Sequence, residues 1–170
     1  IATIEELCSR SLGIASGYIF CACYAGLNIS EVASEKQKKE LLPKVAKGKL
    51  LFSYGISEPD VGADVASVKT KAVKDGDQII INGTKRWCSG PNVTDYIYTI
   101  VRSGPVEDRY RNLSLILIPP SAKGITIEPQ ETLGQKGVGG TCDVIFEDVS
   151  VPIENIVGGE EGWNNGWSKI

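Results

Sequence analysis

The chain has 170 residues, 42% of them apolar, and its 18 Lys and Arg against 21 Asp and Glu give a formal net charge of −3. This length and apolar content suffice for the core of one domain, or of one domain and part of another. The acidic balance argues against a nucleic-acid partner, which would need a basic face. The chain has no His, so it lacks the commonest general base and zinc ligand, and we expect no metal site.

The five cysteines show no Cys-x-x-Cys spacing. They are expected to be small buried thiols of a reducing compartment, the cytoplasm or, in a eukaryote, the mitochondrial matrix. They are Cys8, Cys21, Cys23, Cys88 and Cys142. The chain lacks a run of about 18 apolar residues and the basic start of a signal peptide, so we expect no membrane span. Both ends look cut, since a capping box at Thr3 opens the chain and Ile170 stops a helix expected from Glu160.

Two helices are predicted at the start of the chain. Apolar residues at three- and four-residue steps predict an amphipathic helix over residues 4–27, in which Gly13 and Gly17 indicate close approach of another helix. A Ser-x-x-Gln capping box at Ser34 begins the second helix, and Pro43 is expected to break or kink it. The many lysines near this helix are interleaved with Glu and predict a solvated face rather than a phosphate site.

From about Leu51 the apolar period changes to two, which predicts strands. Hairpin turns are expected at Asp75-Gly76 and Asn82-Gly83. The expected strands cover residues 68–73, 78–81, 84–89, 96–101, 113–118, 125–127 and 144–149. Short strands at this spacing predict an antiparallel barrel or sandwich, so the fold class is α+β. The glycine-rich stretch 134–140 is expected to be a connecting loop rather than a phosphate cradle, because no helix pattern follows it.

Two features indicate a binding site. Residues 54–64 combine carboxylates, a hydroxyl and glycines between a strand and a hairpin, where main-chain groups are free to bind a polar ligand. An ordinary loop with turn hydrogen bonds is the alternative. Trp87 and Ser89 lie two residues apart on a predicted strand, so an aromatic face and a hydroxyl share one side, as a flat conjugated cofactor requires. A core tryptophan is the alternative there.

Five motifs in order make the chain resemble the acyl-CoA dehydrogenases over residues 34–167. They are Gln-Lys-Lys-x-x-Leu-Pro from Gln37, Ser-Glu-Pro-x-x-Gly-x-Asp from Ser57, Lys-Thr-x-Ala from Lys69, Asn-Gly-x-Lys-x-Trp from Asn82 and Phe-Glu-Asp-Val-x-Val-Pro from Phe146. The resemblance implies an FAD oxidoreductase of fatty acid metabolism that desaturates an acyl-CoA between its α and β carbons. It also implies a homotetramer, with electron-transfer flavoprotein as acceptor.

The resemblance implies three parts: a partial N-terminal helical domain (1–49), a middle β-barrel domain (50–158) and the start of a truncated C-terminal helical domain (159–170). Implied cofactor contacts are Tyr54, Ile56, Ser57, Gly62, Ala63, Trp87, Cys88 and Ser89. Ala63 is also the implied substrate contact. By motif position, Trp87 lies against the flavin ring and Ser89 donates near its N5.

The chain departs from the family pattern in two places. Ala63 stands where a Ser or Thr is usual, and Asp60 replaces a small residue. The family's catalytic carboxylate comes from the C-terminal helical domain, so no catalytic residue is assigned here, and these 170 residues alone are expected to bind FAD weakly and be inactive. The alternatives are a same-fold acyl-CoA oxidase, enoyl-CoA reductase or flavin monooxygenase, and a non-enzymatic β-barrel binding module.

Overall fold

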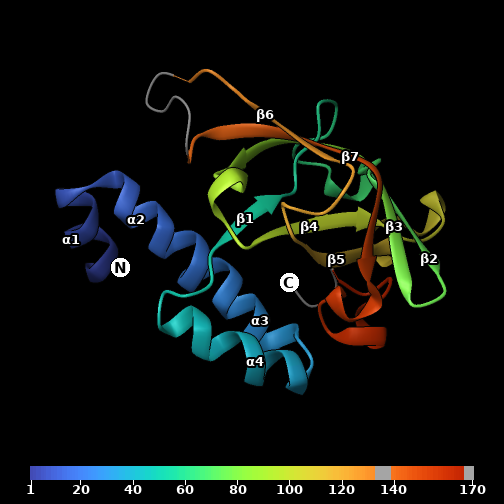
Figure 1. Ribbon diagram of the computed structural model, residues 1–170, viewed down its shortest axis with the longest axis horizontal. Helices are drawn as coiled ribbons and strands as arrows, with labels where there is room; N and C mark the ends of the chain where they lie inside the picture. The colour runs from blue at the N-terminus through green and yellow to red at the C-terminus, as the bar shows by residue number, and fades with distance from the viewer. Residues whose placement is uncertain (133–138, 167–170) are drawn as a thin grey trace.

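The computed structural model describes residues 1–132 and 139–166. Helices come first and pack on one side of a curled sheet (Figure 1). The helices are α1 (Ala2–Arg10), α2 (Leu12–Tyr18), α3 (Leu27–Val32) and α4 (Glu35–Ala46), with the π-helical segment Ile19–Gly26 joining α2 to α3. This order confirms the predicted α+β class, in which helices precede a β-domain.

The first predicted helix is interrupted at Ser11, which the apolar periodicity did not indicate. Ser11 has an extended backbone, ends α1 and begins α2, and its side chain accepts a hydrogen bond from the Ile14 N–H. Serine can interrupt a helix because its hydroxyl forms a hydrogen bond with a nearby backbone group in place of the helical backbone hydrogen bond. The expected capping box at Thr3 is wrong, since Thr3 lies inside α1 and the residue before that helix is Ile1, which makes no side-chain cap.

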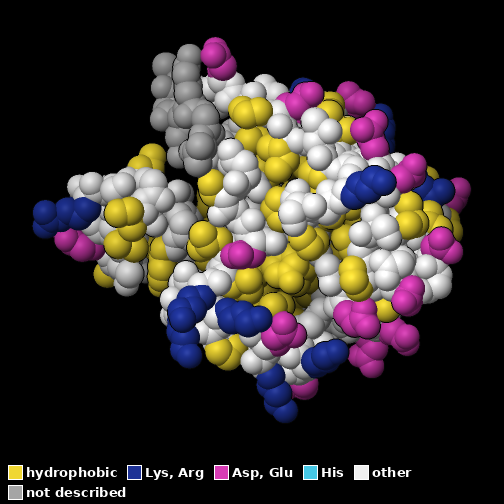
Figure 2. Space-filling model, viewed as in Figure 1, with side chains coloured by type: hydrophobic (Ala, Val, Ile, Leu, Met, Phe, Trp, Pro, Cys, Tyr) yellow, Lys and Arg dark blue, Asp and Glu magenta, His cyan; other side chains and the backbone are white. Residues whose placement is uncertain are grey.

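The helix α4 begins as predicted and continues past Pro43. The Ser34 side chain and backbone exchange hydrogen bonds with Gln37 in a complete capping box. Pro43 does not end the helix, which runs on to Ala46. Leu41 is buried in the core between helices and sheet, and Val45 packs against it, so apolar burial in this last turn opposes the cost of the proline, about 3 kcal/mol. Lysines around α4 face solvent, as expected (Figure 2).

In the described residues, seven strands form one sheet. Six of them lie in the order β1-β4-β2-β3-β7-β6, and β5 pairs with β4 outside this order. They are β1 (Phe52–Gly55), β2 (Lys71–Asp75), β3 (Gln78–Ser89), β4 (Tyr96–Arg102), β5 (Leu113–Ile118), β6 (Ile125–Pro129) and β7 (Thr141–Pro152). Most pairs are antiparallel, but β1 and β2 each pair with β4 in parallel. Alternation along a strand does not show its partner, so this mixture was not predictable.

Of the two predicted hairpin turns, one forms. Asp75 pairs with Gln78 across a tight turn between β2 and β3, with Gly76 at φ +61°. Asn82-Gly83 instead lies inside β3, which continues through an irregularity in its pairing with β7. The Asn82 amide exchanges two hydrogen bonds of 2.9 Å with Asp148 of β7. Those bonds keep the two strands paired past a sequence that favours a turn.

The strand β4 is buried on both faces and separates two cores. Tyr98 and Ile100 belong to the core between the helices and the sheet. Ile97 and Val101 alternate with them and belong to the core inside the curled sheet. The sheet is therefore packed on the inside by its own strands and on the outside by helices, which fixes the end of the neighbouring strand β1.

Several expectations concern the remaining segments. Gly159–Gly162 forms a 3₁₀ turn and residues 163–166 form turns, so the helix expected from Glu160 does not form up to residue 166. Residues 167–170 and most of the 134–140 loop lie outside the described residues. All five cysteines are free, but Cys8 is exposed and Cys23 is only partly buried, contrary to the expectation that all five are buried. The helical stretch Leu12–Val32 is long and apolar enough to cross a membrane, contrary to the expectation that no segment is. Core helices of soluble proteins pass the same test, so it does not show a span.

Candidate functional site

A buried ion pair holds the backbone that follows β1. The Lys85 Nζ of β3 lies 2.9 Å from the Glu58 carboxylate, and their side chains are 0% and 4% exposed. The same ammonium donates to the Ile56 carbonyl at 3.0 Å. The carboxylate also accepts the backbone N–H groups of Lys69 and Thr70, at 2.6 and 2.9 Å. One pair of charges thus ties together three separate segments of chain.

Each of the two buried charges stabilises the charged form of the other. Burial alone would raise the pKa of Glu58, but attraction to Lys85 and the hydrogen bonds outweigh it and hold that pKa below its ordinary value. Burial lowers the pKa of the Lys85 ammonium, against the opposing effect of Glu58. The ionised Glu58 carboxylate already accepts hydrogen bonds from Lys85 and from two backbone N–H groups. Glu58 is therefore not free to act as a general base.

A bulge in β3 turns the predicted indole outward. Between Lys85 and Cys88 the register with β7 shifts, so that Arg86 and Trp87 face a single residue, Asp143. Trp87 has φ +62° and is 58% exposed. Arg86 forms a forked ion pair with Asp143, its Nη2 lying 2.9 Å from Oδ2. An extra residue in one strand is the usual way to re-aim a side chain at a sheet edge.

The Trp87 cavity brings four of the eight predicted cofactor contacts together. It has a volume of about 380 Å³ and is lined by Phe20, Tyr24, Asn28, Tyr54, Ile56, Ser57, Arg86 and Trp87. Its two strand segments are joined directly, because the Arg86 N–H donates to the Ser57 carbonyl at 2.8 Å. The Arg86 guanidinium also lies 5.8 Å from the centre of the indole. The indole and the 54–57 backbone therefore border one hollow.

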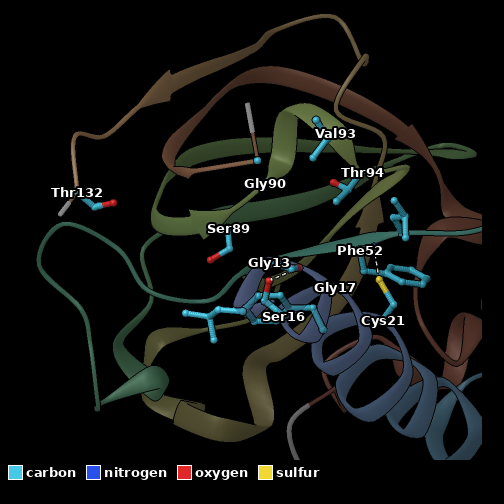
Figure 3. A pocket seen from close by; sticks show the side chains of 14 residues that line it. Gly13, Ser16, Gly17, Cys21, Phe52, Ser89, Gly90, Val93, Thr94 and Thr132 are labelled. Carbon is cyan, nitrogen blue, oxygen red and sulfur yellow. Dashed lines mark hydrogen bonds between the residues drawn. The ribbon is translucent and has the colours of Figure 1, made fainter. Parts of the chain in front are cut away.

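Ser89 lines a second, larger cavity that shares Phe20 with the first. The Ser89 cavity, of about 580 Å³, lies between α2 and the end of β3 (Figure 3). Its lining is Leu12, Gly13, Ser16, Gly17, Phe20, Cys21, Leu51, Phe52, Ser89, Gly90, Val93, Thr94, Thr132 and Gly139. Figure 3 shows the Ser89 side chain facing Gly13 and Ser16 of α2. The helical wall of the cavity therefore combines the small residues Gly13, Ser16 and Gly17 with the apolar Leu12 and Phe20.

The other three predicted contacts lie elsewhere. Gly62 and Ala63 are exposed on the loop after β1 and border neither cavity. Cys88 is fully buried in the core inside the sheet. Burial raises the pKa of its thiol to about 12, so it is neutral at physiological pH. Because its side chain is buried, Cys88 can contact a bound ligand only through its main chain.

Sequence reasoning missed the residues that hold the site in place. Lys85 and Arg86 stand inside the Asn-Gly-x-Lys-x-Trp motif, and Lys85 continues the inward-facing positions of Ile79 and Ile81. A lysine in phase with buried isoleucines signals a paired buried charge. Within residues 1–132 and 139–166, His, Cys, Asp and Glu form no group of three or more that could hold a metal ion.

Comparison with known proteins assigns this arrangement to a class. The family model "Acyl-CoA dehydrogenase, middle domain" matches residues 53–149. Acyl-CoA dehydrogenase FadE26 of Mycobacterium tuberculosis is 36% identical over 84% of this chain and 35% of its own, and mitochondrial isovaleryl-CoA dehydrogenase of Pongo abelii is 31% identical over 94% and 38%. The acyl-CoA dehydrogenase structure from Geobacillus kaustophilus superposes with a TM-score of 0.84 at 29% identity, covering 94% of this chain and 42% of that one.

The chain belongs to the acyl-CoA dehydrogenase family. The expected resemblance is thereby confirmed over the middle-domain region. The chain spans about a third of the length of the curated relatives it matches.

Proposed function

We propose that the chain is the flavin-facing part of an FAD-dependent acyl-CoA dehydrogenase. Residues 50–158 would form the middle domain, residues 1–49 part of the N-terminal helical domain and residues 159–170 the start of the C-terminal one. The supporting observation is the exposed Trp87 beside the 54–57 backbone, with Ser89 in the adjoining cavity. The catalytic base would lie outside these residues, in the C-terminal helical domain that the resemblance implies, and the buried Glu58 is already paired with Lys85.

The residues present fit a flat, conjugated ring. Trp87 supplies an exposed aromatic face held above a hollow, and Arg86 lies against the same indole. Ser57 and Ser89 supply hydroxyls at the two cavities. Bound FAD would accept the hydride that leaves the β carbon of the acyl group. Hydrogen-bond donors from Ser57 and Ser89 would hold the ring and favour negative charge on it. We keep Gly62 and Ala63 as candidates for main-chain contacts to the cofactor or substrate.

Replacing Trp87 by alanine in the full-length protein is expected to weaken FAD binding by roughly tenfold or more, because stacking area is lost. The thermal unfolding midpoint should change little, since most of the indole is already in water. Flavin absorbance and FAD titration measure both quantities. Ser89→Ala should shift the flavin reduction potential, and Tyr110→Ala removes another exposed aromatic residue as a control. Unchanged FAD affinity in Trp87→Ala would count against the proposal.

We place the acyl chain in the Ser89 cavity, where apolar residues surround the hydroxyl. Gly17→Leu should then lower kcat/KM for long or branched acyl-CoAs by about tenfold relative to short ones, because the new side chain occupies the pocket. A Cβ at Gly17 meets nothing within 4 Å, and leucine favours helix, so stability should hold or rise by about 1 kcal/mol. Ser30→Leu on α3, outside both cavities, is the control. Equal effects on all chain lengths would exclude this placement.

Family membership supports the remaining proposals. We propose an acyl-CoA substrate, an electron-transfer flavoprotein as acceptor and a homotetramer in the full-length protein. The five free thiols are consistent with a reducing compartment, the cytoplasm or a mitochondrial matrix. Reduced flavin that reacts rapidly with oxygen, instead of passing electrons to a protein carrier, would favour an oxidase of the same fold.

A further inference from the structure

The loop that meets the Trp87 cavity is attached to β3 at two successive carbonyls. The Ile56 carbonyl accepts a hydrogen bond from the Lys85 ammonium at 3.0 Å. The next carbonyl, of Ser57, accepts from the Arg86 N–H at 2.8 Å. Trp87 follows immediately on β3. Two consecutive residues of one strand thus fix two consecutive peptide groups of the other segment, directly beside the indole.

The Lys85 bond determines the orientation of a peptide group. In a trans peptide the C=O of one residue and the N–H of the next point in opposite directions. The Ile56 carbonyl points inward to a fully buried ammonium. The Ser57 N–H therefore points away from Lys85, and Ser57 is one of the residues that line the Trp87 cavity.

The cost of the ion pair indicates a role beyond stability. Burying two charges is expensive, and apolar residues of similar volume often stabilise a fold equally well or better. Here the charges make a specific set of bonds: Glu58 holds Lys85 in place and is itself held by the backbone of Lys69 and Thr70. A methyl or methylene group in place of the ammonium would leave the Ile56 carbonyl free to rotate.

We propose that Lys85, fixed by Glu58, is a positioning residue that presents the Ser57 main-chain N–H to the flavin ring. This inference rests on the proposed function, because it takes the Trp87 cavity as the place of the ring. It assigns Lys85 no contact with cofactor or substrate. Its effect reaches the ring through a single peptide group, so it should alter the flavin's properties as well as the fold.

The test compares two charge-balanced double variants of the full-length protein. Glu58→Gln with Lys85→Met removes the buried pair, retains an acceptor oxygen for the backbone and leaves no orphan charge. Asp60→Asn with Lys69→Met removes an exposed ion pair of 3.0 Å on the same loop as a matched control. FAD affinity, the flavin absorption spectrum and the flavin reduction potential are measured, with thermal unfolding as the check on folding.

We expect the buried-pair variant to bind FAD about tenfold more weakly, as for one lost hydrogen bond, and to show a shifted spectrum and potential. The control should match the unmodified protein. A folded buried-pair variant with native affinity, spectrum and potential would overturn the inference while leaving the proposed function intact. If the unmodified protein binds no FAD at all, the proposed function fails and the inference fails with it.

Glu58→Gln alone provides a second measurement if the double variant does not fold. Lys85 then retains its bond to Ile56, since even a neutral amine donates. FAD affinity within about threefold of the unmodified protein is expected, because the positioning bond remains. A loss as large as that predicted for the double variant would place the effect in the carboxylate and overturn the role of Lys85.

Discussion

Lys85→Met alone is expected to lower the free energy of unfolding by about 3–5 kcal/mol, because it leaves Glu58 ionised and buried without its partner. Urea unfolding at neutral pH measures the loss. Adding Glu58→Gln should recover part of it, since the orphan charge disappears. Lys69→Met, which breaks only an exposed pair, should cost at most about 1 kcal/mol. If Lys85→Met and Lys69→Met cost a similarly small free energy of unfolding, the buried ion pair would contribute no more to stability than the exposed one.

The loss in Lys85→Met should also depend on pH with a definite sign. Burial raises the pKa of Glu58, and the attraction of Lys85 that opposes it is lost in the variant, so the pKa of Glu58 is higher than in the unmodified protein. The stability lost through Lys85→Met should therefore be smallest in acid, where Glu58 is protonated, and should grow as the pH rises.

Gly83→Ala is expected to destabilise the protein by roughly 3 kcal/mol or more, because two costs combine. Gly83 has φ +146°, which side chains rarely adopt, and an added Cβ would lie 2.5 Å from the Thr70 Cα. Gly76→Ala is the matched control: its φ is +61° but nothing lies within 4 Å, so only about 1 kcal/mol is expected. Equal losses in the two variants would mean that the Thr70 contact relaxes freely.

The same substitution should reach the candidate site. Thr70 donates its N–H to Glu58, so displacement of Thr70 by a new methyl group would pull on the carboxylate that holds Lys85. We therefore expect Gly83→Ala to lower the affinity for FAD and Gly76→Ala to leave it unchanged.

Local signals in the sequence predicted much of the fold. The capping box at Ser34 and the Asp75-Gly76 turn depend on a few adjacent residues, and both form. The Asn82-Gly83 turn does not form and Pro43 does not end its helix, because distant contacts override local preference, namely Asp148 for the first and the helix–sheet core for the second. Parallel pairing of β1 with β4 joins residues far apart in sequence, which periodicity does not encode.

The candidate site was predictable only in part for the same reason. Trp87 and Ser57 could be singled out because both stand in motifs, and they line one cavity. Alternation placed Ser89 on the same side as Trp87, yet the two line neighbouring cavities. The contribution of Phe20 from the helical segment, which borders both, is a tertiary contact with no local signature. The roles of individual residues toward FAD stay predictions.

The bulge at Arg86 and Trp87 has a consequence for how this region tolerates change. The bulge exposes the indole because of the number of residues in each strand: β3 carries one more residue than β7 between the flanking pairs. Amino-acid replacements leave that count intact, whereas deleting one residue there, or inserting one opposite, restores an even ladder and removes the bulge that turns the indole outward. Variants that keep the length of this segment should therefore keep the bulge, and position 87 should face outward whichever side chain it carries.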